Sequence, residues 1–284
     1  MNVLSLFDGI SCGQLALRRV GVNYDKYFAS EIDKYAIKVT RANFPETIQL
    51  GDVRVINATN LPKIDLMIGG SPCQGFSFAG KRLNFDDPRS ELFLEFCRLL
   101  QECKPKWFLL ENVKMAKDHR DVISSFLGVE PIEINSNLVS AQNRRRLYWT
   151  NIPNVTLPVD RGLVLQDVLE DRGSCVDITD RLMAKKEGTL AHVKGWAGVR
   201  FPYQKSKALT AAGQGIANSG ATNVKVGDRY YQLSPVECER LQTVPDNYTQ
   251  CLSKCQRYKV LGNGWTVDVI AHILKGILNE PGEL

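Results

Sequence analysis

The chain has 284 residues, of which 44% are hydrophobic, so it can bury a sizeable core and is not a disordered protein. Its 36 Lys and Arg against 31 Asp and Glu give a net charge of +5, which is compatible with nucleic-acid binding but does not establish it. Eight Cys without a Cys-x-x-Cys pair, and only three His, argue against a zinc site and predict free thiols in a reducing cytoplasm. No basic-then-apolar leader and no membrane-length apolar run are present, so we expect a cytoplasmic protein without a membrane partner.

Strands alternate with helices through the first half of the chain. This alternation predicts an α/β fold with a Rossmann-like, mostly parallel sheet and helices on both faces. The predicted strands are 2–7, 26–30, 47–50, 64–70, 107–110, 132–139 and 146–150. The predicted helices are 14–20, 33–43, 91–103 and 118–126.

The turn after the first strand, residues 8–13, carries only Gly9 and Gly13 and no lysine. It is therefore neither a dinucleotide fingerprint nor a phosphate-binding P-loop. Glu31 and Asp52 end the next two strands, where an acid typically accepts hydrogen bonds from ribose hydroxyls. Either acid alone is more simply a solvated loop residue. Together with the turn, the two acids favour an adenosine-type ligand that lacks a pyrophosphate.

Cys73 follows the apolar run 64–68, after Gly69-Gly70 and Pro72 break the strand. In a parallel sheet this end of the strand is where ligands bind, and a thiolate there could attack an electrophile. A lone cysteine is more often a small packing residue. The long glycine-bearing loop 74–90 beside it is a candidate lid.

The regular pattern weakens after Pro153, which predicts three parts: a catalytic domain at 1–153, a smaller irregular domain at 154–230, and a C-terminal segment at 231–284 that returns to the first domain. The middle part is basic, with Lys and Arg at 185, 186, 194, 200, 205 and 207. Ser234, Pro235 and Glu237 form the signature of a capped helix start. Apolar residues at helical spacing predict a closing helix at 267–278.

Six motifs, in their order along the chain, resemble those of DNA (cytosine-5) methyltransferases over nearly its whole length. Any one motif is weak, whereas the ordered set is specific. The motifs are Phe7-Asp8-Gly9 with Gly13, Ser71-Pro72-Cys73-Gln74, Glu111-Asn112-Val113, Gln142-x-Arg144-x-Arg146, Leu233-Ser234-Pro235-x-Glu237-x-x-Arg240-Leu241-Gln242 and Gly262-Asn263-Gly264. Ser71 and Gly264-Trp265 depart from common bacterial members. Together with Phe7-Asp8-Gly9-Ile10 and Arg89-x-x-Leu92-Phe93, they resemble the animal de novo DNA methyltransferase catalytic domain.

This resemblance implies a Rossmann-like methyltransferase sheet and a target-recognition domain at 154–230. It implies that Cys73 attacks C6 of a cytosine flipped out of duplex DNA. Glu111 would neutralise N3, Arg146 would hold O2 and help fix Glu111, and Arg144 would brace the strand. Lysines between 180 and 210 would contact DNA phosphates.

The resemblance also implies S-adenosyl-L-methionine as cofactor and no metal. Phe7 and Ile32 would sandwich the adenine, Glu31 would take the ribose hydroxyls, and Asp52 and Val53 would contact the adenine edge. The methionine part would be held by Asp8, Gly9, Ile10, Ser11, Cys12, Asn263, Gly264 and Trp265. Leu92 completes the expected cofactor set.

Three other interpretations remain open at this point. The same chemistry could act on RNA, although the large basic second domain favours duplex DNA. A non-catalytic DNA-binding protein of this fold would be expected to lack part of the set Cys73, Glu111 and Arg146. A nicotinamide dehydrogenase is disfavoured because its glycine fingerprint is missing. A homodimer is suggested only by analogy, and the recognised bases and any restriction-modification partner are open.

Overall fold

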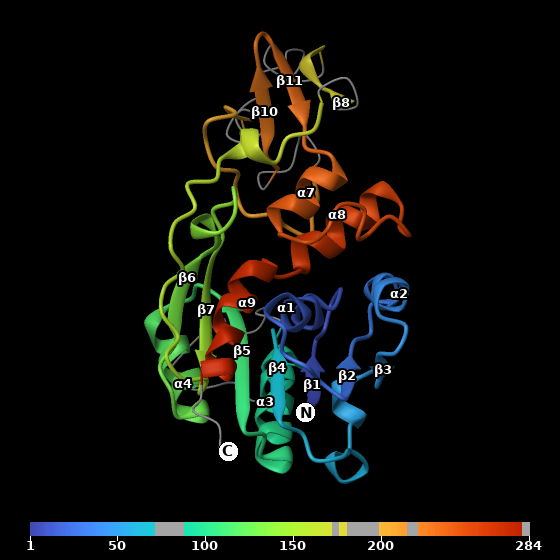
Figure 1. Cartoon of the computed structure of the whole chain (residues 1–284), viewed down its shortest axis with the longest axis vertical. Coiled ribbons are helices and arrows are strands. Elements are labelled where there is room, and N and C mark those ends of the chain that lie inside the picture. The colour runs from blue at the N-terminus through green and yellow to red at the C-terminus, as the bar shows by residue number, and fades with distance from the viewer. Residues whose placement is uncertain (72–87, 172–175, 181–198, 215–220, 280–284) are drawn as a thin grey trace. The chain divides into compact units, whose positions relative to one another are not determined.

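The computed structural model describes residues 1–71, 88–171, 176–180, 199–214 and 221–279. The chain divides into two units (Figure 1). Unit 1 contains Met1–Ile134, Arg145–Leu157 and Ala271–Leu284, and unit 2 contains Asn135–Arg144 and Pro158–Ile270. The catalytic and target-recognition domains predicted from the sequence stay predictions; residues 231–270, predicted to return to the first domain, lie in unit 2.

A seven-stranded sheet in the order β3-β2-β1-β4-β5-β7-β6 organises unit 1. Strands β3, β2, β1, β4 and β5 are parallel, and β7 is antiparallel to β5. The strands are β1 Asn2–Leu6, β2 Lys26–Ser30, β3 Ile48–Gln49, β4 Leu66–Gly69, β5 Trp107–Val113, β6 Ile132–Asn135 and β7 Arg145–Thr150. The helices and 3-10 turns that connect them are α1 Cys12–Val20, α2 Lys34–Asn43, η1 Val53–Val55, η2 Ala58–Asn60, α3 Pro88–Cys103 and α4 Lys117–Leu127.

The strand order reverses at β1, and this reversal determines which face of the sheet each helix covers. The chain first moves outward through β2 and β3 and then returns to place β4 and β5 on the other side of β1. Because crossovers between parallel strands are right-handed, α1 and α2 cover one face of the sheet and α3 and α4 cover the other. Open α/β sheets bind ligands at the carboxyl ends of the strands beside such a reversal.

The face under α3 and α4 holds a core of large apolar side chains. Strand alternation directs Leu4 and Leu6 to this face, where they join Phe93, Phe96 and Trp149 in one buried cluster. Trp149 also donates a hydrogen bond from Nε1 to Oγ of Ser124 in α4 at 3.0 Å. This packing holds the strand ends that carry the candidate site.

Unit 2 has a four-stranded sheet in the order β8-β11-β10-β9, which the sequence analysis did not anticipate in the irregular 154–230 part. Its strands are only two to four residues long, too short to show an alternation in the sequence. The unit 2 elements are η3 Ser136–Leu138, η4 Leu165–Asp167, β8 Val176–Asp177, β9 Val199–Arg200, β10 Asn223–Val226, β11 Arg229–Gln232, α7 Pro235–Leu241 and α8 Lys254–Asn263. Helix α9 Val267–Leu274 runs from unit 2 into unit 1 and is followed by η6 Lys275–Asn279.

The capped start of α7 is confirmed. Oγ of Ser234 accepts from the Glu237 N–H at 3.0 Å, and Oε2 of Glu237 accepts from the Ser234 N–H at 2.8 Å. Two predicted elements end four residues earlier in the structure. The strand predicted at 132–139 ends at Asn135, whose side chain accepts from the Asn137 N–H and starts a 3-10 turn. The closing helix ends as an α-helix at Leu274.

Candidate functional site

The turn after β1 is shaped by three backbone positions in the left-handed region. Phe7 has φ 57°, Gly9 has φ 59° and Ser11 has φ 57°. The Gly9 N–H donates to Oε2 of Glu31, which follows β2, at 2.7 Å. Two apolar residues of the turn are buried: Ile10 and Cys12. The structure thus brings the predicted turn and the predicted ribose-binding acid together.

Asp8 directs its carboxylate into the protein. Oδ1 accepts from the hydroxyl of Tyr27 in β2 at 2.8 Å, and Oδ2 accepts from Oγ of Ser11 at 2.5 Å. Burial raises the pKa of Asp8 to about 6, and the hydrogen bonds from Ser11 and Tyr27 partly oppose this rise. A direct contact of Asp8 with a ligand stays a prediction, and Tyr27 belongs to none of the sequence motifs that indicate the site.

Glu31 and Ile32 present a polar and an apolar group side by side at the end of β2. Oε1 of Glu31 accepts from the N–H groups of Ile32 and Asp33, each at 2.8 Å. A carboxylate has about four acceptor positions, so these two bonds and the Gly9 bond leave one for a ribose hydroxyl. Ile32 is 73% exposed, which suits packing against the flat apolar face of a base.

Asp52 follows β3 and caps η1. Its Oδ1 accepts from the Arg54 N–H at 3.0 Å, and its Oδ2 lies 2.5 Å from the Arg54 guanidinium. These hydrogen bonds from Arg54 lower the pKa of Asp52, so the carboxylate is ionised at neutral pH. Val53 is buried, and Leu92 of α3 packs, partly buried, against the core of unit 1.

Ser71 leaves β4 on the same edge of the sheet and is held by the neighbouring strand. Nδ2 of Asn112 in β5 lies 3.4 Å from the Ser71 carbonyl oxygen and 3.3 Å from its Oγ. Cys73 lies outside the described residues, and so do residues 74–87 of the predicted lid loop. Residues 88–90, assigned to that loop from the sequence, are the first turn of α3.

Glu111 and Arg146 form a largely buried ion pair at the β5–β7 ladder. Nε of Arg146 lies 2.9 Å from Oε1 of Glu111, and their side chains are 16% and 11% exposed. The antiparallel register, in which Val113 faces Arg146, brings the start of β7 to the carboxyl end of β5. Neighbouring Arg145 is more exposed and lies 3.7 Å from Glu133 on the surface. Strand alternation therefore separates the two arginines onto opposite faces.

Arg144 lies in unit 2 and is buried. Its guanidinium donates to the backbone carbonyls of Leu209 at 2.9 Å, Gly262 at 3.2 Å and Gly264 at 2.9 Å. Arg144 therefore fixes the backbone around Asn263–Trp265, the second predicted cofactor segment. This geometry favours a positioning role for Arg144, whose direct part in catalysis stays a prediction.

Gln242 is a further candidate positioning residue to which the sequence analysis gave no role. Its buried Nε2 donates to the carbonyls of Leu261 at 2.7 Å and Gly264 at 3.0 Å. Its Oε1 accepts from Oγ1 of Thr266 at 2.9 Å and lies 3.3 Å from Nε2 of Gln142. Gln142 and Gln242 both belong to the quoted motifs, and that membership was the signal that could have identified them.

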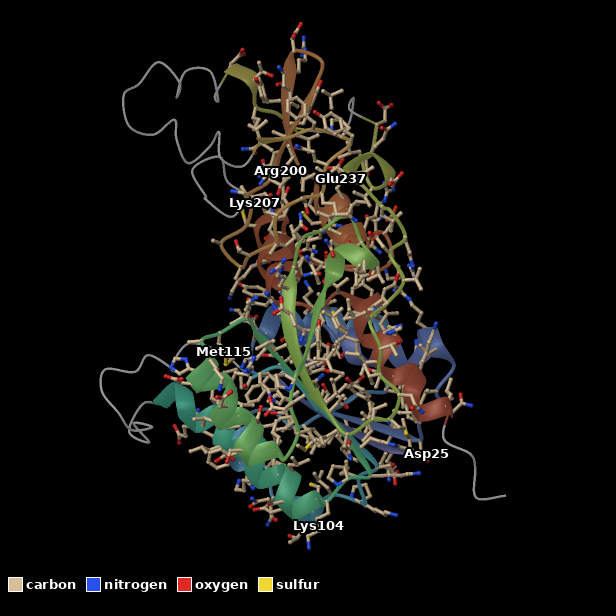
Figure 2. All side chains as sticks on the ribbon, turned by 90° about the vertical axis from the view of Figure 1, so that its left-hand side faces the viewer. Asp25, Lys104, Met115, Arg200, Lys207 and Glu237 are labelled. Carbon is tan, nitrogen blue, oxygen red and sulfur yellow. The ribbon has the colours of Figure 1, made fainter. Side chains whose placement is uncertain are left out.

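The described basic residues of the 180–210 region differ in their surroundings. Nζ of Lys205 donates to the Asn137 carbonyl at 2.5 Å and is thus engaged within unit 2, so its predicted role as a phosphate contact is disfavoured. Arg200 and Lys207 lie in the same part of unit 2 (Figure 2), and burial together with the Arg200 charge lowers the pKa of Lys207. Lys185, Lys186 and Lys194 lie outside the described residues.

Residues 1–129 and 169–279 match the family model of C-5 cytosine-specific DNA methylases. The chain is 31% identical to the type II methyltransferase M1.ScrFI of Lactococcus lactis subsp. cremoris, over 98% of this chain and 78% of that protein. It is 30% identical to the type II methyltransferase M.HhaI of Haemophilus parahaemolyticus, over 98% and 94%. The chain therefore belongs to the C-5 cytosine-specific DNA methylase family, and the predicted DNA (cytosine-5-)-methyltransferase class is confirmed.

A solved methyltransferase structure shares the fold of this chain. The S. pombe Dnmt2 methyltransferase superposes with a TM-score of 0.80 over 100% of both chains at 20% identity, which is a likeness of fold alone. The predicted α/β methyltransferase fold is confirmed, and this family and fold are those of S-adenosylmethionine-dependent methyltransferases. Within the described part of the chain, no helix has the length and apolar character needed to span a membrane.

Proposed function

We propose that the protein methylates C5 of a cytosine flipped out of duplex DNA, through a covalent bond between Cys73 and C6. The observation that carries this proposal is the buried Glu111–Arg146 pair at the strand edge where Ser71 leads toward Cys73. This carboxyl group is held by a guanidinium and lies on β5, the strand that pairs with β4, and Cys73 follows β4 in the sequence. A carboxyl group held in this way suits stabilisation of charge on a pyrimidine ring.

The residues after β1, β2 and β3 fit S-adenosylmethionine. Glu31 keeps one acceptor position for the ribose, exposed Ile32 offers an apolar surface for the adenine, and ionised Asp52 lies one strand further. We assign the methionine part to the turn Phe7–Cys12, and the role of Asn263–Trp265 of unit 2 stays a prediction from the sequence. When bound, this cofactor supplies an electrophilic methyl group.

The protein side chains make the cytosine reactive. The Cys73 thiolate forms a bond to C6, which moves electron density toward C5 and N3. Glu111 donates a proton or a hydrogen bond at N3, and Arg146 fixes the Glu111 carboxyl group while its guanidinium faces the base O2. After C5 carries the methyl group, loss of the C5 proton and of the Cys73 sulfur restores the ring and the free thiol.

Duplex DNA is the proposed partner. Arg200 and Lys207 place two positive charges in the same part of unit 2, and a pair of cations of this kind suits contact with a DNA phosphate. Contacts of this kind set affinity and its salt dependence without reading the base sequence.

Trapping of the covalent intermediate tests the proposal. Duplex DNA with 5-fluorocytosine at the target position and S-adenosylmethionine should give a protein–DNA complex that survives denaturing electrophoresis, because fluorine cannot leave as a proton does. Bisulfite sequencing of DNA from a host that expresses the protein supplies the target context. Cys73→Ala should abolish the complex, whereas Cys255→Ala, at an exposed cysteine of α8, should retain it.

A matched pair of variants tests the role assigned to Glu111. Glu111→Gln should lower the methylation rate about a hundredfold or more, because the ring nitrogen loses its proton donor. Glu133→Gln, at a surface carboxylate paired with Lys114, should leave the rate unchanged. A trapped complex with Cys73→Ala, or label from S-adenosylmethionine on RNA alone, would overturn the proposal.

A further inference from the structure

The turn after β1 adopts a conformation that its own residues do not favour. Phe7 and Ser11 both carry a Cβ and both have φ 57°, in the left-handed region. Such positions persist only where the surroundings hold them, and they concentrate at ligand-binding sites. The groups that hold this turn are therefore candidates for control of the ligand geometry.

Ser11 shows how the turn is held. It immediately precedes α1, where a serine side chain normally accepts from the first N–H groups of the helix. Here the Ser11 side chain makes no such bond. Its Oγ instead lies 2.5 Å from Oδ2 of Asp8 and 3.0 Å from Oγ1 of Thr40 in α2.

Counting protons gives these bonds a direction. The single Ser11 hydroxyl proton goes to the Asp8 carboxylate, so Ser11 can only accept from Thr40. Tyr27 donates its hydroxyl proton to the other Asp8 oxygen at 2.8 Å. All four side chains are at least nine-tenths buried, so water does not replace a missing partner easily.

The same turn connects to the ribose-binding acid. Gly9 lies between Asp8 and Ser11, and its N–H donates to Oε2 of Glu31 at 2.7 Å. The Thr40 hydroxyl also lies 3.5 Å from the Gly9 carbonyl oxygen. A change in the Asp8–Ser11 geometry would therefore turn the Gly9 peptide and move the Glu31 carboxylate.

We propose that Tyr27 and Thr40 are positioning residues of the cofactor site, which hold Asp8 and Ser11 so that the turn and Glu31 keep the geometry that binds S-adenosylmethionine. This inference rests on the proposed function, because it takes that cofactor as the ligand. It assigns roles to two residues, one from β2 and one from α2, that point into the protein rather than toward the ligand.

Calorimetric titration of the full-length protein with S-adenosylmethionine and with S-adenosylhomocysteine, without DNA, tests the inference. Tyr27→Phe and Thr40→Val each remove one buried hydroxyl and should raise the dissociation constant about tenfold. Thr40→Ser keeps the hydroxyl and should bind within about twofold of wild type. Tyr24→Phe is the control tyrosine, because its hydroxyl accepts from Nε2 of Gln14 rather than donating to Asp8.

Steady-state kinetics separates positioning from a general loss of folded protein. Tyr27→Phe and Thr40→Val should raise KM for S-adenosylmethionine and leave kcat within about twofold, whereas partial unfolding would lower kcat at unchanged KM. If Tyr27→Phe does not fold, the Thr40→Val and Thr40→Ser pair decides the matter. Wild-type affinity in folded Tyr27→Phe and Thr40→Val would overturn this inference alone. A wild-type protein that binds neither ligand would overturn the proposed function as well.

Discussion

Among the described glycines, Gly262 near the end of α8 is the one where an added methyl group should destabilise the protein most. A Cβ there would lie 2.1 Å from the carbonyl carbon of Thr210, 2.3 Å from its oxygen and 2.4 Å from the backbone nitrogen of Ala211. All three are backbone atoms, so no side-chain rotation can relieve the overlap. A separation of about 3 Å, the least that packed atoms tolerate, requires a backbone shift of about 1 Å.

That shift is opposed on both sides of the contact. The Leu209 N–H donates to Oε1 of Gln142 at 2.8 Å, while Arg144 holds the carbonyls of both Leu209 and Gly262. Gly262→Ala should therefore combine overpacking with at least one weakened buried hydrogen bond, a loss of about 3 kcal/mol in the free energy of unfolding. For a chain of this size the melting temperature should fall by roughly 5 °C.

Thermal unfolding followed by circular dichroism measures this loss. Gly128→Ala is the matched control, because Gly128 has φ +70° but open space around a Cβ, so only backbone strain of about 1 kcal/mol applies. We also expect weaker cofactor binding by Gly262→Ala, since Asn263–Trp265 follows directly. A Gly262→Ala protein as stable as Gly128→Ala would refute the reasoning, because it would mean that the Thr210 backbone yields without loss.

Three further predictions follow from single groups. Burial raises the pKa of Asp8 from 3.8 to about 6, so the folded protein binds the Asp8 proton more tightly than the unfolded protein does. The contribution of Asp8 to the free energy of unfolding is therefore greatest below pH 3.8. It falls by about 3 kcal/mol as the pH rises through about 6. Urea unfolding across this range should show that slope in wild type and lose it in Asp8→Asn. Ser234→Ala removes the cap of α7 and should cost about 1 kcal/mol in the same assay; an unchanged urea midpoint would contradict the capping argument. Lys207→Ala should reduce the slope of log affinity for duplex DNA against log salt by about 1, and Lys205→Ala, whose Nζ binds the protein's own carbonyls, should leave that slope unchanged.

Local sequence patterns determined the α/β class and many of the residues at the sheet edge that carries the candidate site. Alternating strand and helix signals predict a parallel sheet, and in such a sheet the residues after each strand share one edge. We therefore expect Phe7–Cys12, Glu31, Asp52 and Ser71 to lie together, and the structure shows the Gly9–Glu31 contact that follows from this expectation. The α7 cap was equally accessible, because Ser234 and Glu237 are only three residues apart.

Tertiary structure decided the contacts between residues far apart in the sequence. The antiparallel insertion of β7 beside β5 brings Arg146 to Glu111, and no local pattern in either strand specifies that neighbour. The hydroxyls of Tyr27 and Thr40 reach the first turn from elements whose sequences show only that those side chains are buried or helical. A periodic pattern reports which face of an element is covered, but the partner that covers it is set by the strand order and by the packing of the whole unit.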